Sequence, residues 1–271
     1  MKRKVNLVGF AFVLLLTGCL IFGKETANKS KTASDVKDTV NSLIKDTKDS
    51  ADKSSDVPSD QNDMSEDDKA NVLTDIPDYD GVHDVVELAF DPYTFSQAER
   101  SGTISSTSFG DLDSLGRCTG AVSTISKSTM PTEKRGEIGM VKPTGWVQAK
   151  YDPDKTGSDS PYLYNRCHLI AFELSGENAN EKNLITGTRQ MNMNMLTYEN
   201  KVADYVRETG HKVRYRVTPV FKNNNLLATA VRIDAYSLED KTIAFSVLVF
   251  NVENSVTIDY ATGRSTGPVY E

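Results

Sequence analysis

The chain of 271 residues predicts an α+β domain with a largely antiparallel central sheet flanked by helices. Several strand-like runs follow one another through short turns, and one long stretch, residues 190–209, has apolar residues at three- and four-residue steps. Strands joined by short turns pair antiparallel, because parallel neighbours need a long crossover connection. The first observation therefore predicts the sheet, and the second predicts an amphipathic helix packed against it.

The elements can be placed in order along the chain. A short helix is expected at 94–102, ending at Gly102, and the long helix at 190–209, with Gly210 just past its end. Strands are expected where apolar or β-branched residues recur: 85–90, 117–125, 145–151, 162–168, 213–221, 226–235 and 243–252, with a short one in 251–260.

Two segments carry clusters of cations. In the predicted strand 213–221, Arg214 and Arg216 give one cationic face. The Gly- and Pro-rich loop 130–145 and its approach carry four cations: Lys127, Lys134, Arg135 and Lys142. A loop of this kind can form a phosphate-binding rim or a solvated surface loop, and both interpretations stay open.

The N-terminus has the pattern of an export signal. Lys2, Arg3 and Lys4 precede an apolar run, 5–16, that is too short for a comfortable membrane span. Small residues then lead to Cys19, which resembles the bacterial lipobox. That resemblance implies a signal peptide of residues 1–18 and a lipid on Cys19 that anchors the protein to the membrane. The alternative is an ordinary signal peptide with a chance cysteine.

Residues 19–78 predict a disordered polar tether. This range has 8 Lys, 14 Asp or Glu and no aromatic residue after Phe22, so it cannot bury enough apolar surface to fold. Residues 79–271 then form one domain, large enough for a good core. Of the net charge of −7 for the whole chain, residues 79–271 carry −4, and this mild acidity argues against a protein that coats nucleic acid through bulk charge.

With Cys19 lipidated, two cysteines remain. An exported pair such as Cys118 and Cys167 can form a disulfide, and two buried free thiols are the alternative.

The main candidate for chemistry is the segment 164–171, which contains His168. Imidazole titrates near neutral pH and can act as a general base, although a lone histidine in a strand is more often structural. Residues two apart in a strand point to the same side, so Arg166 and His168 should face one site. Asn165 and Cys167 should point away, which makes a Cys167–His168 dyad or zinc pair unfavourable. The other histidines, His83 and His211, show no zinc-ligand spacing with His168.

A phosphodiester needs a cation to neutralise its oxygens, and Mg²⁺ can be held by one or two protein oxygens while it keeps several waters. Asn192 and Asn194 lie near the start of the long helix, and Glu199 lies about two turns beyond Asn192. These residues are candidate metal ligands, and N-caps or surface polar residues are the alternative.

The run Tyr164-Asn165-Arg166-Cys167-His168 resembles the Asp-Arg-Gly-His signature of the DNA/RNA non-specific endonucleases, which are ββα-metal nucleases. The resemblance continues through 177–189, Asn192 and 199–205, and upstream through 131–136 and 142–146. It covers roughly residues 112–260.

The resemblance implies a ββα-metal fold and a role for each matching residue. His168 matches the general base and Arg166 the signature arginine that supports the site and the phosphate. Asn192 matches the Mg²⁺ ligand and Glu199 the acidic residue near the metal-bound water. Asn183 matches an asparagine that positions phosphate, and Arg189 is kept as a phosphate-clamp candidate without a firm counterpart.

Two residues depart from the signature. Asn165 stands where the family has Asp, so one charge that helps to orient the site is missing. Cys167 stands where the family has Gly, so a side chain must fit behind the strand.

The sequence therefore predicts a Mg²⁺-dependent endonuclease without sequence preference that hydrolyses DNA, with RNA as a further substrate and Mn²⁺ as a substitute metal. It is expected on the extracellular face of the cell membrane, held by lipidated Cys19 and partly secreted, with no obligate protein partner. Two alternatives stay open: a catalytically silent nucleic-acid-binding lipoprotein involved in DNA uptake, and an exported phosphodiesterase for smaller substrates.

Overall fold

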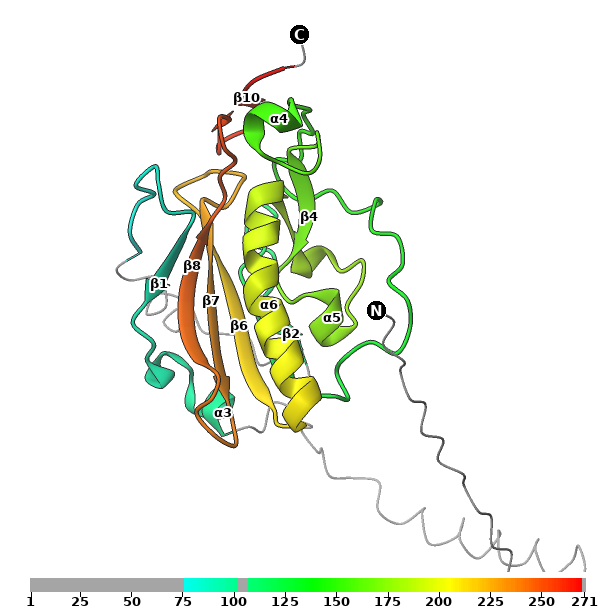
Figure 1. Cartoon of the computed structure of the whole chain (residues 1–271), viewed down its shortest axis with the longest axis vertical. Coiled ribbons are helices and arrows are strands. Elements are labelled where there is room, and N and C mark those ends of the chain that lie inside the picture. Colours follow the sequence, from blue (N-terminus) through cyan, green and yellow to red (C-terminus); the bar gives the residue numbers. More distant parts are fainter. Residues whose placement is uncertain (1–75, 102–106, 270–271) are drawn as a thin grey trace, which may run out of the picture. The chain divides into compact units, whose positions relative to one another are not determined.

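The computed structural model describes residues 76–101 and 107–269 of the chain (Figure 1). The predicted signal peptide, Cys19 and nearly all of the predicted tether lie outside the described residues, as does Gly102. No helix in the described ranges is long and apolar enough to cross a membrane.

A six-stranded sheet organises the domain, with the strand order β1–β8–β7–β6–β3–β2. Every neighbouring pair in it is antiparallel, which confirms the predicted sheet. Its strands are β1 (Val85–Leu88), β2 (Ser108–Phe109), β3 (Ala121–Ile125), β6 (Val213–Val220), β7 (Ala230–Ser237) and β8 (Ala244–Phe250).

Two smaller antiparallel pairs complete the strands. The strand β4 (Tyr164–His168) pairs with β5 (Leu184–Thr188), so that Arg166 lies opposite Thr186 and His168 opposite Leu184. Near the C-terminus, β9 (Thr257–Ile258) pairs with β10 (Ser265–Thr266).

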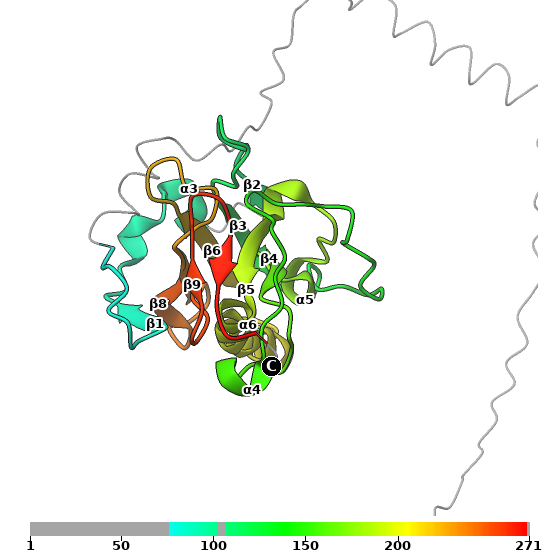
Figure 2. The same cartoon turned by 90° about the horizontal axis from the view of Figure 1, so that it is seen from above.

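The long helix α6 (Arg189–Thr209) packs against one face of the large sheet, beside the β4–β5 pair (Figures 1 and 2). It begins where the Thr188 hydroxyl accepts a hydrogen bond from the Met191 amide, and it ends at Gly210 in the left-handed conformation. Apolar side chains on its inner face, such as Met195 and Val202, share the main core with the sheet. The short helices are η1 (Pro92–Thr94), α3 (Gln97–Arg100), α4 (Pro153–Thr156), α5 (Phe172–Ser175) and η2 (Glu181–Asn183).

The opposite face of the sheet is polar but covered. Arg214 and Arg216 are fully buried there, so the predicted cationic face of this strand is not open to solvent or substrate. Arg216 donates hydrogen bonds to the Thr94 carbonyl oxygen and to Asp234, and its guanidinium lies 4.0 Å from the centre of the Phe95 ring. The segment with η1 and α3 thus closes this face of the sheet.

Three local predictions need correction. Residues 145–151 form only an isolated bridge, between Lys150 and Tyr162, and no strand. The pairing does not continue, because the Gln148 side-chain amide bonds both backbone groups of Tyr164. The strand β5 was not predicted, because its five residues follow a polar segment and run into the long helix without a turn signal between them. The expected helix 94–102 divides into η1 and α3, with Ser96 capping the second.

Candidate active site

The site is a cleft between strand β4, the first turn of α6 and the loop 131–148. Its volume is about 390 Å³. Cationic, amide and aromatic side chains share its wall: Arg135, Trp146, Gln148, Ser160, Tyr162, Tyr164, Asn165, Arg166, Arg189 and Asn192, together with Ile138.

His168 is buried behind the cleft wall, with 7% of its surface exposed, and it adjoins the cleft through its contact with the lining residue Arg135. Its Nε2 is 2.8 Å from the carbonyl oxygen of Asn178, which can only accept a hydrogen bond. Its Nδ1 is 3.4 Å from a guanidinium nitrogen of Arg135, which can only donate. Both neighbours favour the neutral ring with the proton on Nε2, so the Nδ1 lone pair points toward the Arg135 side of the cleft.

The electrostatics of the site keep this imidazole neutral. Burial lowers the pKa of His168 below its ordinary value, and the positive charge of Arg135 lowers it further, against the opposing effect of the Asn178 hydrogen bond. A ring that is neutral at physiological pH, with no proton on Nδ1, has the state that a general base requires.

Arg166 lines the cleft, but its guanidinium is already engaged by the loop 131–148. It donates hydrogen bonds to the carbonyl oxygens of Val141 and Gly139. The same group lies 4.1 Å from the centre of the Trp146 ring. In this structure Arg166 therefore fastens the loop that carries Arg135 to the strand that carries His168.

Cys167 points away from the cleft into the core, as the strand alternation predicts. The same prediction is wrong for Asn165, which lines the cleft together with Arg166. The space for its side chain comes from Gly187 on the neighbouring strand, where an added Cβ would lie 2.5 Å from the Cys167 sulfur. The chain thus places a glycine on β5 that leaves room for the cysteine on β4.

Cys118 and Cys167 are both free and buried, which answers the disulfide question in favour of two thiols. Cys118 donates its S–H toward the carbonyl oxygens of Glu181 and Leu184. Burial raises the pKa of the Cys118 thiol to about 12, so neither its position nor its protonation suits a nucleophile.

Helix α6 presents Asn192 and Glu199 on one face, because seven residues make almost two helical turns. Asn192 lines the cleft, whereas the Asn194 amide oxygen accepts a hydrogen bond from Gln190 on the same helix. Of the two candidate asparagines, Asn192 is therefore the one placed at the cleft.

Glu199 lies deeper, with 8% of its surface exposed. Within the described part of the chain its carboxylate forms no hydrogen bond or ion pair. Burial, together with the nearby charge of Glu173, raises its pKa to about 8, against the smaller opposing effect of Arg135.

These residues fit a hard divalent cation held by few protein ligands. In the ranges 76–101 and 107–269, no group of three His, Cys, Asp or Glu residues could hold a metal. An amide oxygen and a buried carboxylate on the same face of one helix suit Mg²⁺, which accepts oxygen ligands and retains several waters. A bound cation would also favour the ionised form of the Glu199 carboxyl.

The structure does not bring Asn183 to the cleft. Its side chain is fully buried, and its amide oxygen and nitrogen bond the backbone N–H and carbonyl of Ile170. Its visible role is to hold the turn that follows His168. Arg189 does line the cleft, where it is bonded at 2.6 Å by each of the two carboxylate oxygens of Asp159.

Two contributors to the site were not singled out from the sequence. Arg135 was one of four loop cations, and only its position beside His168 distinguishes it from the other three. Asn178 acts through its backbone carbonyl, which no side-chain pattern can indicate, although its amide also bonds the Glu137 carbonyl of the same loop.

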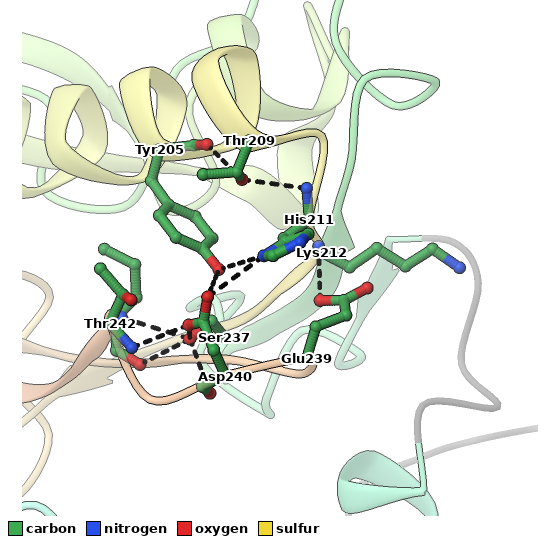
Figure 3. A network of polar contacts seen from close by, with 9 residues as sticks. Tyr205, Thr209, His211, Lys212, Ser237, Glu239, Asp240 and Thr242 are labelled. Atoms are coloured by element: carbon green, nitrogen blue, oxygen red, sulfur yellow. Dashed lines mark hydrogen bonds and ion pairs between the residues drawn. The ribbon is translucent and has the colours of Figure 1, made fainter.

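The other two histidines lie elsewhere, and each has an acidic partner that the sequence did not reveal. His83 Nδ1 is 2.6 Å from Asp80. Beyond the C-terminal end of α6, the His211 ring contacts Asp240 at 3.1 Å and the Tyr205 hydroxyl at 3.0 Å (Figure 3). This network ties the helix end to the turn between β7 and β8.

Comparison with known proteins agrees with this geometry. The profile of the DNA/RNA non-specific endonuclease family matches residues 98–238, more than half of the chain. The chain belongs to this family. The match includes His168, Asn192, Glu199, Arg166 and Arg135, and it makes the protein an endonuclease that acts on nucleic acid.

Solved structures support the family and the ββα-metal fold. NucA from Streptococcus agalactiae with magnesium bound is 27% identical, with a TM-score of 0.53 over 59% of this chain and 77% of that chain. The same protein without metal gives 28% identity and a TM-score of 0.51 over the same shares. The Sda1 nuclease with a bound zinc ion is 28% identical, with a TM-score of 0.50 over 62% and 81%. The predicted α+β fold with its antiparallel sheet is confirmed.

Proposed function

We propose that this endonuclease hydrolyses the phosphodiester bonds of DNA, and of RNA, without sequence preference and with Mg²⁺, using His168 as the general base. The observation that carries the proposal is the position of His168: its Nε2 is fixed on a backbone carbonyl, and its Nδ1 lone pair faces the cationic side of the cleft. Non-specific cutting requires only backbone contacts, which cations on a loop and a helix can make.

In the proposed reaction His168 Nδ1 takes a proton from the attacking water. The Asn178 carbonyl holds the imidazole in the required tautomer and stabilises the imidazolium that forms. Arg135 can move its donors from Nδ1 to the scissile phosphate once substrate binds.

Asn192 would hold the metal, and Glu199 would orient its waters. When bound, the ion supplies positive charge to the phosphate oxygens and to the leaving oxygen. Magnesium in NucA and zinc in Sda1 show that metal ions bind in neighbours of this fold, which supports a divalent ion here; Mn²⁺ is the proposed substitute. Arg189 remains the proposed phosphate clamp, although it must exchange Asp159 for phosphate.

The test is incubation of the purified protein with plasmid DNA in Mg²⁺, in Mn²⁺ or in chelator, beside His168→Ala and Asn192→Ala. We expect degradation that needs the metal and is lost in both variants. Intact plasmid with the wild-type protein in Mg²⁺ would contradict the nuclease proposal. DNA that is bound in a gel shift but never cut would favour the silent binding protein.

A rescue experiment isolates the role of the base. In His168→Gly, added imidazole should restore cutting, because a free imidazole can occupy the space of the side chain and accept the proton. Degradation that is the same in His168→Ala and wild type would contradict the mechanism.

We also propose that residues 1–18 are a signal peptide, that 19–78 are a tether, and that a lipid on Cys19 holds the domain 79–271 at the outer face of the membrane. The support is the basic start, the apolar run and the lipobox-like sequence. Labelling with an alkyne fatty acid should mark the wild-type protein in membranes and leave Cys19→Ala unlabelled; equal labelling of both would contradict the anchor.

A further inference from the structure

The aromatic end of the cleft has no role in the mechanism above. Three aromatic residues line the cleft: Trp146, Tyr162 and Tyr164. Tyr164 is 1% exposed, and the guanidinium of Arg166 lies over the Trp146 ring. Tyr162 differs from both, because 46% of its surface is exposed.

The position of the Tyr162 ring is set by its surroundings. Residue 162 forms an isolated antiparallel bridge with Lys150, and the Lys150 ammonium lies 4.6 Å from the centre of the Tyr162 ring. The Tyr162 amide is also bonded by the Ser160 hydroxyl. The Tyr162 ring is thus held at the cleft wall next to Lys150, two residues before the strand β4 that carries Arg166 and His168.

The polar groups beside this ring are already bonded within the protein. The amide of Gln148 bonds the backbone of Tyr164 through both its oxygen and its nitrogen. This amide is therefore not free to read the edges of bases, whereas an exposed ring can stack on the face of any base.

We propose that Tyr162 is a stacking subsite for a nucleobase next to the scissile phosphate, with Lys150 contacting the adjoining backbone. The inference rests on the proposed function of the cleft. Stacking tolerates every base, so the subsite adds affinity without sequence preference. In a duplex the base faces are covered by their neighbours, so the enzyme should favour single strands, mismatches and frayed ends, where a base is free or easily unstacked.

The test uses a single-stranded oligonucleotide with one ordinary phosphodiester, all other linkages being nuclease-resistant phosphorothioates. Two further versions carry an abasic residue on the 5′ or the 3′ side of the cleavable bond. The kcat/KM of each is measured for wild type, Tyr162→Ala, Tyr162→Phe and a matched control, Tyr93→Ala. Tyr93 is also an exposed tyrosine beside a cation, Arg100, but it lies outside the cleft.

For the wild type we expect one of the two abasic versions to be cut roughly 5- to 100-fold less efficiently. Tyr162→Ala should cut the intact oligonucleotide worse by a similar factor and lose the abasic penalty, whereas Tyr162→Phe and Tyr93→Ala should behave as wild type. An abasic penalty that is unchanged in Tyr162→Ala, or the absence of any penalty in wild type, would overturn the subsite while leaving the nuclease proposal intact. A wild type that degrades plasmid DNA in Mg²⁺ but not the intact oligonucleotide would also overturn the subsite alone; if it cuts neither, both proposals are overturned.

Discussion

Burial keeps the His168 ring neutral, and the charge of Arg135 beside Nδ1 adds to this effect. The pKa of His168 is lowered from its ordinary value of 6.5, so the base stays in its active form down to a lower pH than a solvated histidine would. The acidic limb of the kcat/KM profile should therefore lie below about pH 6.5. The same shift affects stability: the unfolded chain binds this proton more readily, so the free energy of unfolding falls as pH drops below about 6.5.

Replacing Arg135 tests its contribution. Arg135→Gln removes a positive charge next to Nδ1, so the pKa of His168 should rise and the acidic limb should move to higher pH. Arg135→Lys keeps the charge and serves as the control, with a limb near that of wild type. A pH–rate profile with the same midpoint in Arg135→Gln and in wild type would show that the arginine does not tune the base.

Asp159 occupies the guanidinium of Arg189 in the free enzyme. Because a carboxylate and a phosphate compete for the same donors, Asp159→Asn should release Arg189 for substrate and lower the KM for DNA at low salt, on the order of two- to fivefold. Asp154→Asn, in the preceding helix α4, is a matched control, since it makes the same charge change without a bond to Arg189. If Asp159→Asn and Asp154→Asn lower the KM equally, the cause is the loss of one negative charge that repels DNA, and not the release of Arg189 from Asp159.

At the scale of single residues, the sequence predicted which side chains lie at the site better than it predicted the partners that they bond. His168, Arg166 and Asn192 line or adjoin one cleft as expected, because strand alternation and helix periodicity place side chains regardless of the rest of the fold. The roles of Asn178 and Asp159 depend on loops that meet only in three dimensions. In the sequence Asn183 could not be distinguished from an asparagine of the cleft, but its side-chain amide bonds the buried backbone of Ile170.

At the scale of elements, the strand pair β4–β5 explains how the chain tolerates the departure from the family signature at Cys167. An added Cβ at Gly187 would lie 2.5 Å from the Cys167 sulfur and 2.4 Å from the methyl carbon of Met191. The two strands and helix α6 therefore fit together only with a small residue at one of the two positions.

Gly187→Ala should lower the free energy of unfolding by about 1–3 kcal/mol, since overpacking a full core forces side chains off their rotamers. In a Cys167→Gly background the same substitution should cost less, because the sulfur that it meets is absent. Urea denaturation of the four proteins gives this comparison. Identical costs in both backgrounds would mean that the cysteine and the glycine are not coupled.

Length alone did not decide which elements could be predicted, since the short strands β1, β3 and β4 were expected and β5 was not. Helix α6 and the strands β6 and β8 carry enough periodic residues to be seen in sequence, whereas β5 has five residues and no turn signal before α6. The side chain of Gln148 takes the place of a strand in 145–151, which a propensity pattern cannot distinguish from a strand.

At the scale of the whole molecule, the catalytic face of the sheet is supported by a cover on the other side. Arg214, Arg216, Arg232 and Asp234 are buried between the sheet and the segment with η1 and α3. Asp234 accepts hydrogen bonds from Arg232, Arg216 and Ser246. The pattern of alternating arginines thus reflects an internal ion-pair layer that needs this cover to exclude water.

Phe95 is the apolar centre of that cover, with 1% of its surface exposed, its ring 5.0 Å from Tyr236 and the Arg216 guanidinium over its face. Phe95→Ala should lower the free energy of unfolding by about 3–5 kcal/mol, because it leaves a cavity and admits water to the buried charges. Tyr93→Ala, two residues away and 78% exposed, should change it by less than about 0.5 kcal/mol. Denaturation curves measure both. The cover lies on the face of the sheet opposite α6 and the cleft. The Phe95→Ala protein that remains folded should therefore keep the kcat of wild type. A lower kcat in protein that is still folded would show that the two faces of the sheet are coupled.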